Sequence, residues 1–264
     1  MLKRILTSII GLVVFFGVIF SHHYVLYSAV ILLIMGMLYE VYGVMGIRKE
    51  LKAVGFLSAL IICAGFLFGR MIAAGVISCM LFLLMMIYLH GKSDSKEVLS
   101  AAFMTIFITV FMTMLILIRR RCDRYTVILP FICAWLTDTG AYFAGTFLGK
   151  HKLVPNISPK KTIEGAIGGI LLSTIGSVLY IVIMVAVMAG GMASTEAVLK
   201  FAFIGFIGSF LAQAGDLIAS CIKRDCGKKD YGSILPGHGG IMDRFDSVIF
   251  VTPFVYYAMI HLVL

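Results

Sequence analysis

Charged residues are scarce in this sequence. Asp, Glu, Lys and Arg make up 13% of its 264 residues, whereas Ala, Val, Ile, Leu, Met, Phe, Trp, Tyr and Cys make up 61%, and the mean hydropathy is +1.06. Soluble domains carry about 25% charged residues, and a soluble globule of about 300 residues still exposes about a quarter of its unfolded surface. This composition therefore excludes a soluble enzyme, a disordered protein and a collagen-like chain. The chain requires lipid as its solvent.

Closely spaced cysteine ligands are also missing. The six cysteines lie mostly in apolar segments, without a CxxC pair or a nearby histidine, which argues against a zinc site and a disulfide framework. We expect them to be small buried hydrophobes. A Walker A sequence is absent too, which excludes a P-loop ATPase.

Acidic residues are fewer than basic ones, and the net charge is +9. No basic run is interleaved with aromatic residues for base stacking, so we expect no nucleic acid partner. Basic loops beside anionic lipid headgroups explain the excess better. A basic site for phosphate-bearing substrates remains as an alternative.

Long apolar runs fill most of the chain, and a bilayer core requires about 20 apolar residues per helix. They are continuous rather than alternating, which is unlike a β-barrel. The first run is interpreted as a retained helix because no small-x-small cleavage site follows it. The sequence thus predicts an all-α polytopic membrane protein with about nine transmembrane helices, at residues 5–20, 24–44, 54–69, 71–90, 97–118, 126–148, 165–190, 197–222 and 245–264.

Polar residues are concentrated in the second half. Residues 138–246 hold eight of the thirteen acidic residues, so we expect a scaffold at 1–118 and a catalytic region at 119–264 within a single membrane domain. Most basic loops fall on one side in a nine-helix alternation, and the positive-inside rule makes that side cytoplasmic. The cluster of Arg119, Arg120, Arg121 and Arg124 falls on the other side and contradicts the rule.

Four aspartates occupy positions where lipid-facing charge is costly, namely Asp138, Asp216, Asp243 and Asp246. An aspartate at a helix centre costs about 2.5–3.5 kcal/mol on insertion scales, so it normally faces a cavity and a partner. A structural aspartate paired with Lys or Arg is the plain alternative for any one of them. Carboxylates on one face of each of two helices favour Mg²⁺, completed by water or phosphate. We therefore predict an active site in a polar cavity formed by the C-terminal helices.

Other polar groups suit phosphate. Asp216, Ser220 and Lys223 lie at i, i+4 and i+7 on one helix face. Two basic loops, 158–165 and 223–240, add lysines, hydroxyls and glycine amides that can form an anion nest. Each loop taken alone also fits a solvated loop beside a membrane.

Residues 220–246 resemble the signature of a known family. The pattern is Ser220-x-Ile222-Lys223-Arg224-(four residues)-Lys229-Asp230-x-Gly232-(two)-Leu235-Pro236-x-His238-Gly239-Gly240-Ile241-x-Asp243-Arg244-Phe245-Asp246. It resembles the signature of phosphatidate cytidylyltransferases (CDP-diacylglycerol synthases). The upstream segments Asp138-Thr139-x-Ala141-Tyr142 and Ser158-Pro159-Lys160-Lys161-Thr162 are also similar to that family, and Glu40 at a helix end is in keeping with it. The resemblance is strong from 138 to 246 and general before that.

The resemblance implies the reaction CTP + phosphatidate → CDP-diacylglycerol + pyrophosphate, dependent on one or two Mg²⁺ ions, at the cytoplasmic face of the cell membrane. It implies as catalytic residues Asp138, Lys223, Arg224, Asp243, Arg244 and Asp246, and as metal ligands Asp216, Asp243 and Asp246. It implies as substrate-binding residues Ser158, Lys160, Lys161, Thr162, Ser220, Lys229, His238, Gly239 and Gly240. His238 is either a base or a donor that orders the loop.

Two other classes of function share parts of this pattern. A transporter or channel also carries intramembrane carboxylates and glycine-broken helices, although no internal repeat is present. A kinase or transferase acting on a polyprenol shares the charge distribution and is separated only by the signature. The oligomeric state stays open, with a homodimer as the alternative to glycine-rich helices that pack within one chain.

Overall fold

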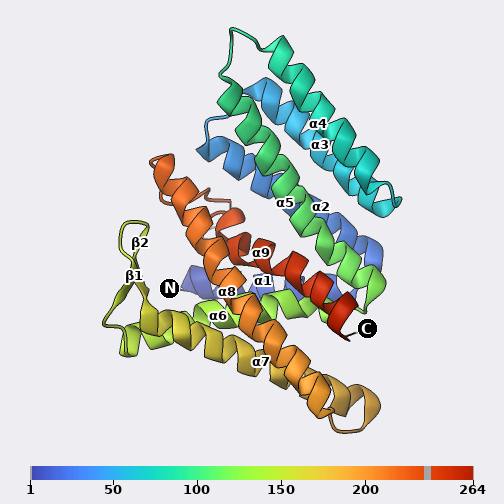
Figure 1. The fold of residues 1–264 in the computed structure, drawn as a ribbon, viewed down its shortest axis with the longest axis vertical. Helices are drawn as coiled ribbons and strands as arrows, with labels where there is room; N and C mark the ends of the chain where they lie inside the picture. Colours follow the sequence, from blue (N-terminus) through green and yellow to red (C-terminus); the bar gives the residue numbers. More distant parts are fainter. Residues whose placement is uncertain (1, 235–238, 264) are drawn as a thin grey trace. The chain divides into compact units, whose positions relative to one another are not determined.

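The computed structural model describes residues 2–234 and 239–263. Nearly all of this part of the chain is helical, apart from one short hairpin (Figure 1). The elements in order are α1 (Leu2–Phe20), α2 (His23–Val44), α3 (Lys49–Leu67), α4 (Met71–Tyr88), α5 (Ser95–Arg121), η1 (Thr126–Ile128), α6 (Leu129–Phe147), β1 (Lys152–Val154), β2 (Ser158–Thr162), α7 (Ile163–Ala189), α8 (Thr195–Asp225), α9 (Met242–Ala258) and the π-helical turn η2 (Met259–Val263).

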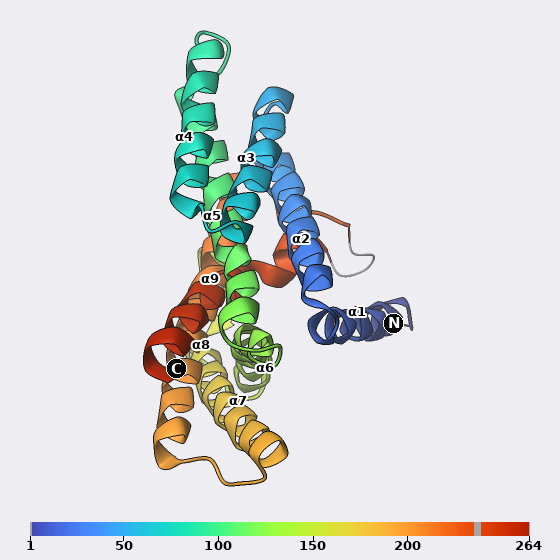
Figure 2. The same cartoon turned by 90° about the vertical axis from the view of Figure 1, so that its right-hand side faces the viewer.

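Each of the nine apolar runs coincides with one helix. Within the described residues, eight helices are long and apolar enough to cross a membrane, from α2 to α9 with its η2 extension. Figure 2 shows α1 lying across the axis of α2 rather than alongside it. The prediction of a helical polytopic membrane protein is confirmed.

The chain divides into two compact units. The first unit is Met1–Leu117 with Cys226–Arg244, and the second unit is Ile118–Asp225 with Phe245–Leu264. Helices α5 and α9 each contribute to both units. The sequence boundary at 118 between scaffold and catalytic region stays a prediction, and residues 226–244 join the N-terminal helices in the first unit.

The first unit is held together by polar contacts within an apolar bundle. The Tyr42 hydroxyl of α2, which is fully buried, hydrogen-bonds the Thr105 hydroxyl of α5. On α4, the Ser78 hydroxyl donates to the Ser58 carbonyl of α3 over 3.4 Å. Lipid tails are as apolar as leucine, so such hydrogen bonds and close packing stabilise helix pairs where the hydrophobic effect does not.

In the second unit α6 packs along α7, and α7 packs along α8. A Cβ atom added at Gly168 of α7 would lie 2.3 Å from the Ala144 Cβ and 3.0 Å from the Gly140 carbonyl oxygen of α6. Only glycine therefore permits this approach. Between α7 and α8, the Ser173 hydroxyl donates to the Gly205 carbonyl over 2.9 Å.

A β-hairpin replaces the loop expected between α6 and α7. Strands β1 and β2 pair antiparallel, with Lys152 opposite Thr162 and Val154 opposite Ser158. The Thr162 hydroxyl then accepts a hydrogen bond from the Gly165 amide over 3.1 Å and caps α7. The hairpin and the cap fix Lys160 and Lys161 relative to the start of α7.

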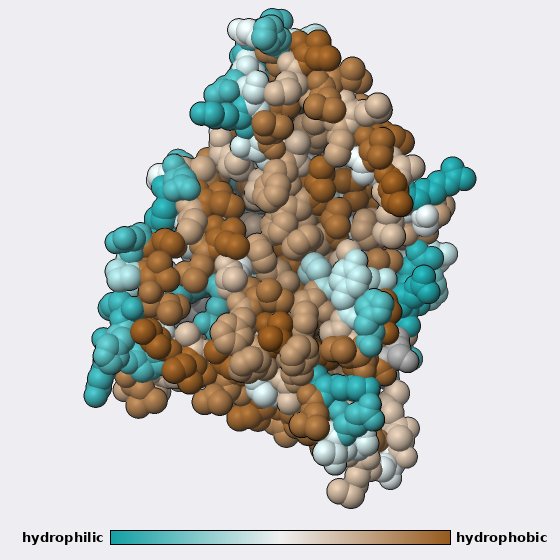
Figure 3. Space-filling view, in the orientation of Figure 1, coloured by the Kyte–Doolittle hydropathy of each residue, from teal (hydrophilic) through white to brown (hydrophobic). Residues whose placement is uncertain are grey.

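Apolar side chains remain exposed on the outside of the helices, as the brown areas of Figure 3 show. On α7 the exposed residues recur every fourth position: Ile163, Ile167, Leu171, Ile175, Leu179, Ile183 and Val187. In a membrane protein such a stripe packs against lipid tails or against another apolar helix.

Candidate functional site

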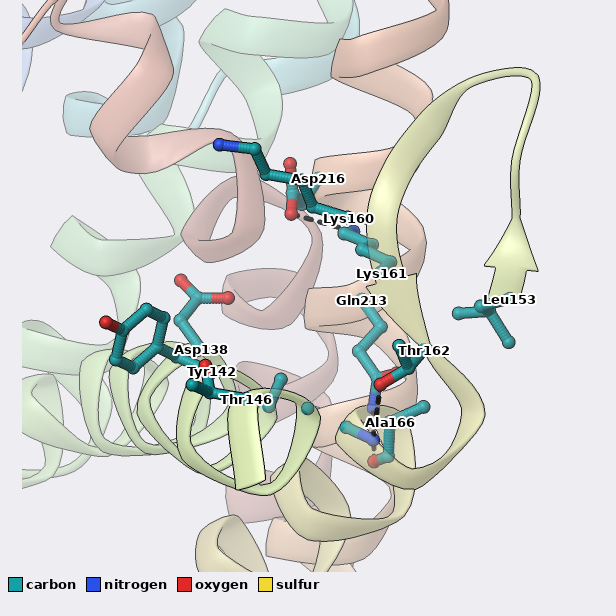
Figure 4. A pocket seen from close by; sticks show the side chains of 13 residues that line it. Asp138, Tyr142, Thr146, Leu153, Lys160, Lys161, Thr162, Ala166, Gln213 and Asp216 are labelled. Atoms are coloured by element: carbon teal, nitrogen blue, oxygen red, sulfur yellow. Dashed lines mark hydrogen bonds and ion pairs between the residues drawn. The ribbon is translucent and has the colours of Figure 1, made fainter. Parts of the chain in front are cut away.

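The second unit contains a polar pocket among α6, β2, α7 and α8, with a volume of about 360 Å³. Figure 4 shows side chains from all four elements around it. Its polar lining consists of Asp138, Tyr142, Thr146, Lys160, Lys161, Thr162, Gln213 and Asp216. The pocket thus combines carboxylates and lysines in the part of the chain where the sequence predicted a polar cavity.

One ion pair crosses this pocket. The Lys161 ammonium of β2 lies 2.7 Å from an Asp216 carboxylate oxygen of α8, and both side chains are partly exposed, at 24% and 31%. Figure 4 draws this contact beside Lys160. The Lys161 nitrogen atom is itself buried, so a charged ligand has to replace the Asp216 oxygen as its partner.

Gln213 lies one turn before Asp216 on the same face of α8. Its side-chain amide donates to the Ala166 carbonyl over 3.2 Å and to the Ser209 hydroxyl over 3.3 Å. It therefore ties α8 to the first turns of α7 at the wall of the pocket. The sequence reasoning missed it, although its i−3 spacing from Asp216 was a usable signal.

A buried cluster of charge adjoins Asp216. Asp246 of α9 and Lys223 of α8 are 7% and 9% exposed, and Asp246 interacts electrostatically with Asp216, Lys223 and Asp138. The Ser247 amide donates to Asp246 over 2.8 Å, and the Ser220 hydroxyl donates to Asp216 over 3.4 Å. Three carboxylates and the Lys223 ammonium thus gather in the second unit, next to the Lys160 and Lys161 ammonium groups of the pocket.

This donor set suits a hard cation in its chemistry. The three acids offer only oxygen atoms, which Mg²⁺ prefers, and Mg²⁺ usually keeps several waters or phosphate oxygens. Within residues 2–234 and 239–263, no three His, Cys, Asp or Glu side chains stand close enough to bind a metal by themselves. Water and substrate phosphate would have to complete any coordination.

In the first unit, Asp243 organises the glycine-containing segment before α9. Its Oδ2 accepts hydrogen bonds from the Tyr231 amide over 2.8 Å and from the Gly240 amide over 3.1 Å. Gly239 has a φ of +86°, in the left-handed region, which favours glycine. Asp243 therefore shapes the segment that carries the predicted phosphate-binding amides.

Glu40 of α2 supports the same segment from the other direction. It is 3% exposed, and its Oε2 accepts the Met242 amide over 2.9 Å. A Cβ atom at Gly232 or at Gly240 would lie 2.5 Å from one of its carboxylate oxygens. Two glycines are thus needed for the carboxylate to fit, and Glu40 fixes the start of α9.

The chain matches the model of the Cytidylyltransferase family over residues 2–262. The chain belongs to this family.

This chain is similar to several curated relatives with the name phosphatidate cytidylyltransferase. The protein of Staphylococcus saprophyticus is 46% identical over 136 residues, 52% of this chain and 49% of the relative. That of Bacillus subtilis is 40% identical over 146 residues, 53% and 50% of the two chains. That of Staphylococcus aureus strain COL is 48% identical over 132 residues, 48% and 46%. The chain thus spans about half the length of the curated relatives it matches.

The predicted site residues of this cytidylyltransferase-family protein fall into four groups. The pocket and the adjoining cluster bring together Asp138, Lys160, Lys161, Thr162, Asp216, Ser220, Lys223 and Asp246. Ser158 lies at the start of β2 outside the pocket lining, and Arg224 is exposed at the end of α8. The first unit holds Lys229, Gly239, Gly240, Asp243 and Arg244. His238 lies outside the described residues.

Proposed function

We propose that this protein is a phosphatidate cytidylyltransferase, which converts CTP and phosphatidate to CDP-diacylglycerol and pyrophosphate. Membership of the Cytidylyltransferase family supports the nucleotidyl transfer, and the names of the bacterial relatives support the substrate. The observation that carries the proposal is the pocket in which Lys161 and Lys160 stand beside Asp216 and Asp138. Cations and carboxylates in one pocket suit a triphosphate.

Catalysis of this reaction depends on aligning the lipid phosphate with CTP more than on a general base. The phosphate of phosphatidate is largely a dianion at neutral pH, since its second pKa is about 6. One of its oxygens attacks the α-phosphorus of CTP in line, a new P–O bond forms, and the bond to the departing pyrophosphate breaks. Lys160 and Lys161, with Lys223, Arg224, Lys229 and Arg244, offset the repulsion between the two anions.

The other predicted residues complete the phosphate site. Ser158, Thr162 and Ser220 offer hydroxyl groups, and the Gly239 amide, with His238, offers hydrogen-bond donors. The Gly240 amide donates to Asp243, so its proposed role toward phosphate requires it to exchange that partner. Asp138 keeps the pocket polar beside Asp216. Because the acyl chains stay in the bilayer, only the headgroup has to meet CTP.

Mg²⁺, as one or two ions, is the proposed cofactor, with Asp216, Asp243 and Asp246 as its protein ligands. The bound metal would supply neutralisation of the phosphate charge during transfer. The oxygen atoms of these carboxylates fit such an ion.

The proposed site faces the cytoplasm of the cell membrane. Most basic loops fall on one side in the alternation of helices, and the positive-inside rule makes that side cytoplasmic, where CTP is made. A homodimer is also proposed, with the exposed apolar stripe of α7 as its contact surface. Crosslinking in native membranes tests this, because a monomer in lipid gives no dimer band.

The central experiment uses the purified full chain in detergent micelles. CTP labelled at the α-phosphate, phosphatidate and Mg²⁺ should yield labelled chloroform-extractable lipid together with equimolar pyrophosphate. EDTA should abolish both products, and full activity in EDTA would overturn the magnesium proposal. Replacing CTP by dCTP or ATP, or phosphatidate by a polyprenol, tests substrate class, and turnover of polyprenol alone would overturn the assignment.

Asp216→Asn is the variant that tests the role of Asp216 in the proposed site. We expect about a 100-fold loss of turnover, because the charge that faces Lys161 and the proposed metal disappears. Glu196→Gln is the control on the same helix, because Glu196 pairs only with Lys200 at the exposed start of α8. Equal activities of Asp216→Asn and the wild type would remove Asp216 from the site.

A further inference from the structure

The arginine cluster that contradicts the positive-inside rule ends α5. Arg119, Arg120 and Arg121 occupy its last turn, and Arg124 lies 5.5 Å over the Tyr125 ring. The acid within this stretch is Asp123, whose Oδ1 accepts the Tyr125 and Thr126 amides over 2.6 and 2.8 Å. That carboxylate oxygen caps η1. The stretch 119–125 therefore holds four arginines and one acid.

A second pocket of the second unit adjoins this cluster. Its volume is about 380 Å³, and it is lined by Arg121, Tyr256, Tyr257, Ile260 and His261. No carboxylate among the described residues lines it. The Tyr257 and His261 rings stack at 6.1 Å with an interplanar angle of 6°. The lining therefore combines a guanidinium, an imidazole, two phenols and one aliphatic side chain.

This pocket lies far from the reaction pocket along α9. Asp246 and Tyr257 belong to the same helix, and eleven residues at 1.5 Å each separate them by about 16 Å. In the alternation of helices, the end of α5 and the end of α9 lie on the same side, opposite the β1–β2 hairpin that carries Lys160 and Lys161. Tyrosines are enriched at membrane interfaces, where their rings lie at the depth of the lipid headgroups. The alternation and the two tyrosines together assign the second pocket to the interface opposite the one where phosphate transfer is proposed.

We propose that this second pocket binds the phosphate headgroup of an anionic phospholipid. Arg121 is exposed, and its planar guanidinium can donate two hydrogen bonds to one phosphate. The tyrosine hydroxyls donate to the remaining polar groups, while Ile260 meets the first carbons of an acyl chain. A lipid rather than a soluble nucleotide is the occupant, because the aromatic rim places the pocket at the interface. The site gives Arg121, one of the arginines that contradict the positive-inside rule, a role that does not depend on the proposed transferase activity.

The test measures lipid retention without turnover. The purified full chain is loaded with equimolar phosphatidylglycerol and phosphatidylcholine, and bound lipids are counted by native mass spectrometry. We expect Arg121→Gln and Tyr257→Leu each to lower the ratio of bound phosphatidylglycerol to phosphatidylcholine by at least about 3-fold. Arg70→Gln is the matched control, because Arg70 is exposed in the turn between α3 and α4 and lines neither pocket.

A further arm separates a lipid from a free anion. Inorganic phosphate at millimolar concentration should leave the retained phosphatidylglycerol unchanged, because it lacks the acyl chain. Complete displacement by inorganic phosphate would overturn the lipid assignment. Equal lipid ratios in Arg121→Gln, Arg70→Gln and the wild type would overturn the site itself. Arg121→Lys keeps the positive charge, so its lipid ratio shows whether the lower ratio of Arg121→Gln reflects misfolding.

Discussion

Buried charge decides what single residues do in this protein. A carboxylate or ammonium removed from water is tolerated when a partner of opposite sign lies close to it. Lys223 is that partner for the buried Asp246, and Lys161 is the partner of Asp216 at the pocket. Each lysine stabilises the acid beside it, and each is a cation that the proposed reaction uses.

Lys223→Met should therefore destabilise the protein by about 3–5 kcal/mol, because it leaves the buried Asp246 carboxylate without its cation. The double variant Lys223→Met/Asp246→Asn should recover part of that loss, since one buried charge is then neutral. Thermal unfolding in detergent measures both. Lys200→Met, at the exposed start of α8, should change stability by less than about 1 kcal/mol, and equal effects at 200 and 223 would contradict this account.

Glu40→Ala should cost about 1–3 kcal/mol, because the Met242 amide loses its acceptor in a buried position. The same change should lower the proposed activity, since the segment before α9 loses its support. Glu50→Ala on the exposed face of α3 is the control for both measurements. A Glu40→Ala protein with wild-type unfolding and turnover would show that the contact with Met242 is dispensable.

Neighbouring helices of the second unit are joined by close approach of their backbones. Glycines and small hydroxyl residues bring α6, α7 and α8 together, and that contact places Asp138, Gln213 and Asp216 around one pocket. The capping of α7 by Thr162 then brings the lysines of β2 to its rim. The pocket depends on the spacing of helices as much as on its own side chains.

Gly168→Val should separate α6 from α7, because even a Cβ atom meets Ala144 at 2.3 Å. Overpacking of this kind costs about 1–3 kcal/mol, so the unfolding midpoint and the proposed activity should both fall. Gly75→Val on α4 is the control, since a Cβ atom there has no neighbour within 4 Å in the described residues. Unchanged stability of Gly168→Val would mean that the helices repack freely.

At the scale of the whole molecule, alternation of helices through the bilayer fixes which turns share a side. The turn after α4 and the turn after α7 are separated by α5, α6 and α7, so they should lie on opposite sides. In a cysteine-free background, Ser93→Cys should react with a membrane-impermeant maleimide only from the cytoplasmic side, and Ser194→Cys only from the other. Labelling of both from one side would contradict the proposed topology.

Much of this architecture was predictable because lipid imposes a simple rule. Every backbone amide in the bilayer must be bonded within its own helix, so continuous apolar runs such as 71–90 and 197–222 marked α4 and α8. The hairpin at 152–162 was missed, because strands of three and five residues leave no periodic pattern. Asp138 and Asp216 were identified because an acid in an apolar run is costly anywhere, whereas Gln213 is uncharged and gave no such signal.

Composition and local motif spacing are enough to identify a helical membrane protein of the Cytidylyltransferase family, because neither depends on long-range contacts. Which side chains meet depends on the packing of the helices. It joined Lys161 to Asp216 across 55 positions and Glu40 to Met242 across 202, and it set Arg121 beside Tyr257. Such contacts follow from how helices pack, and packing depends on the shapes of many side chains at once rather than on any local pattern.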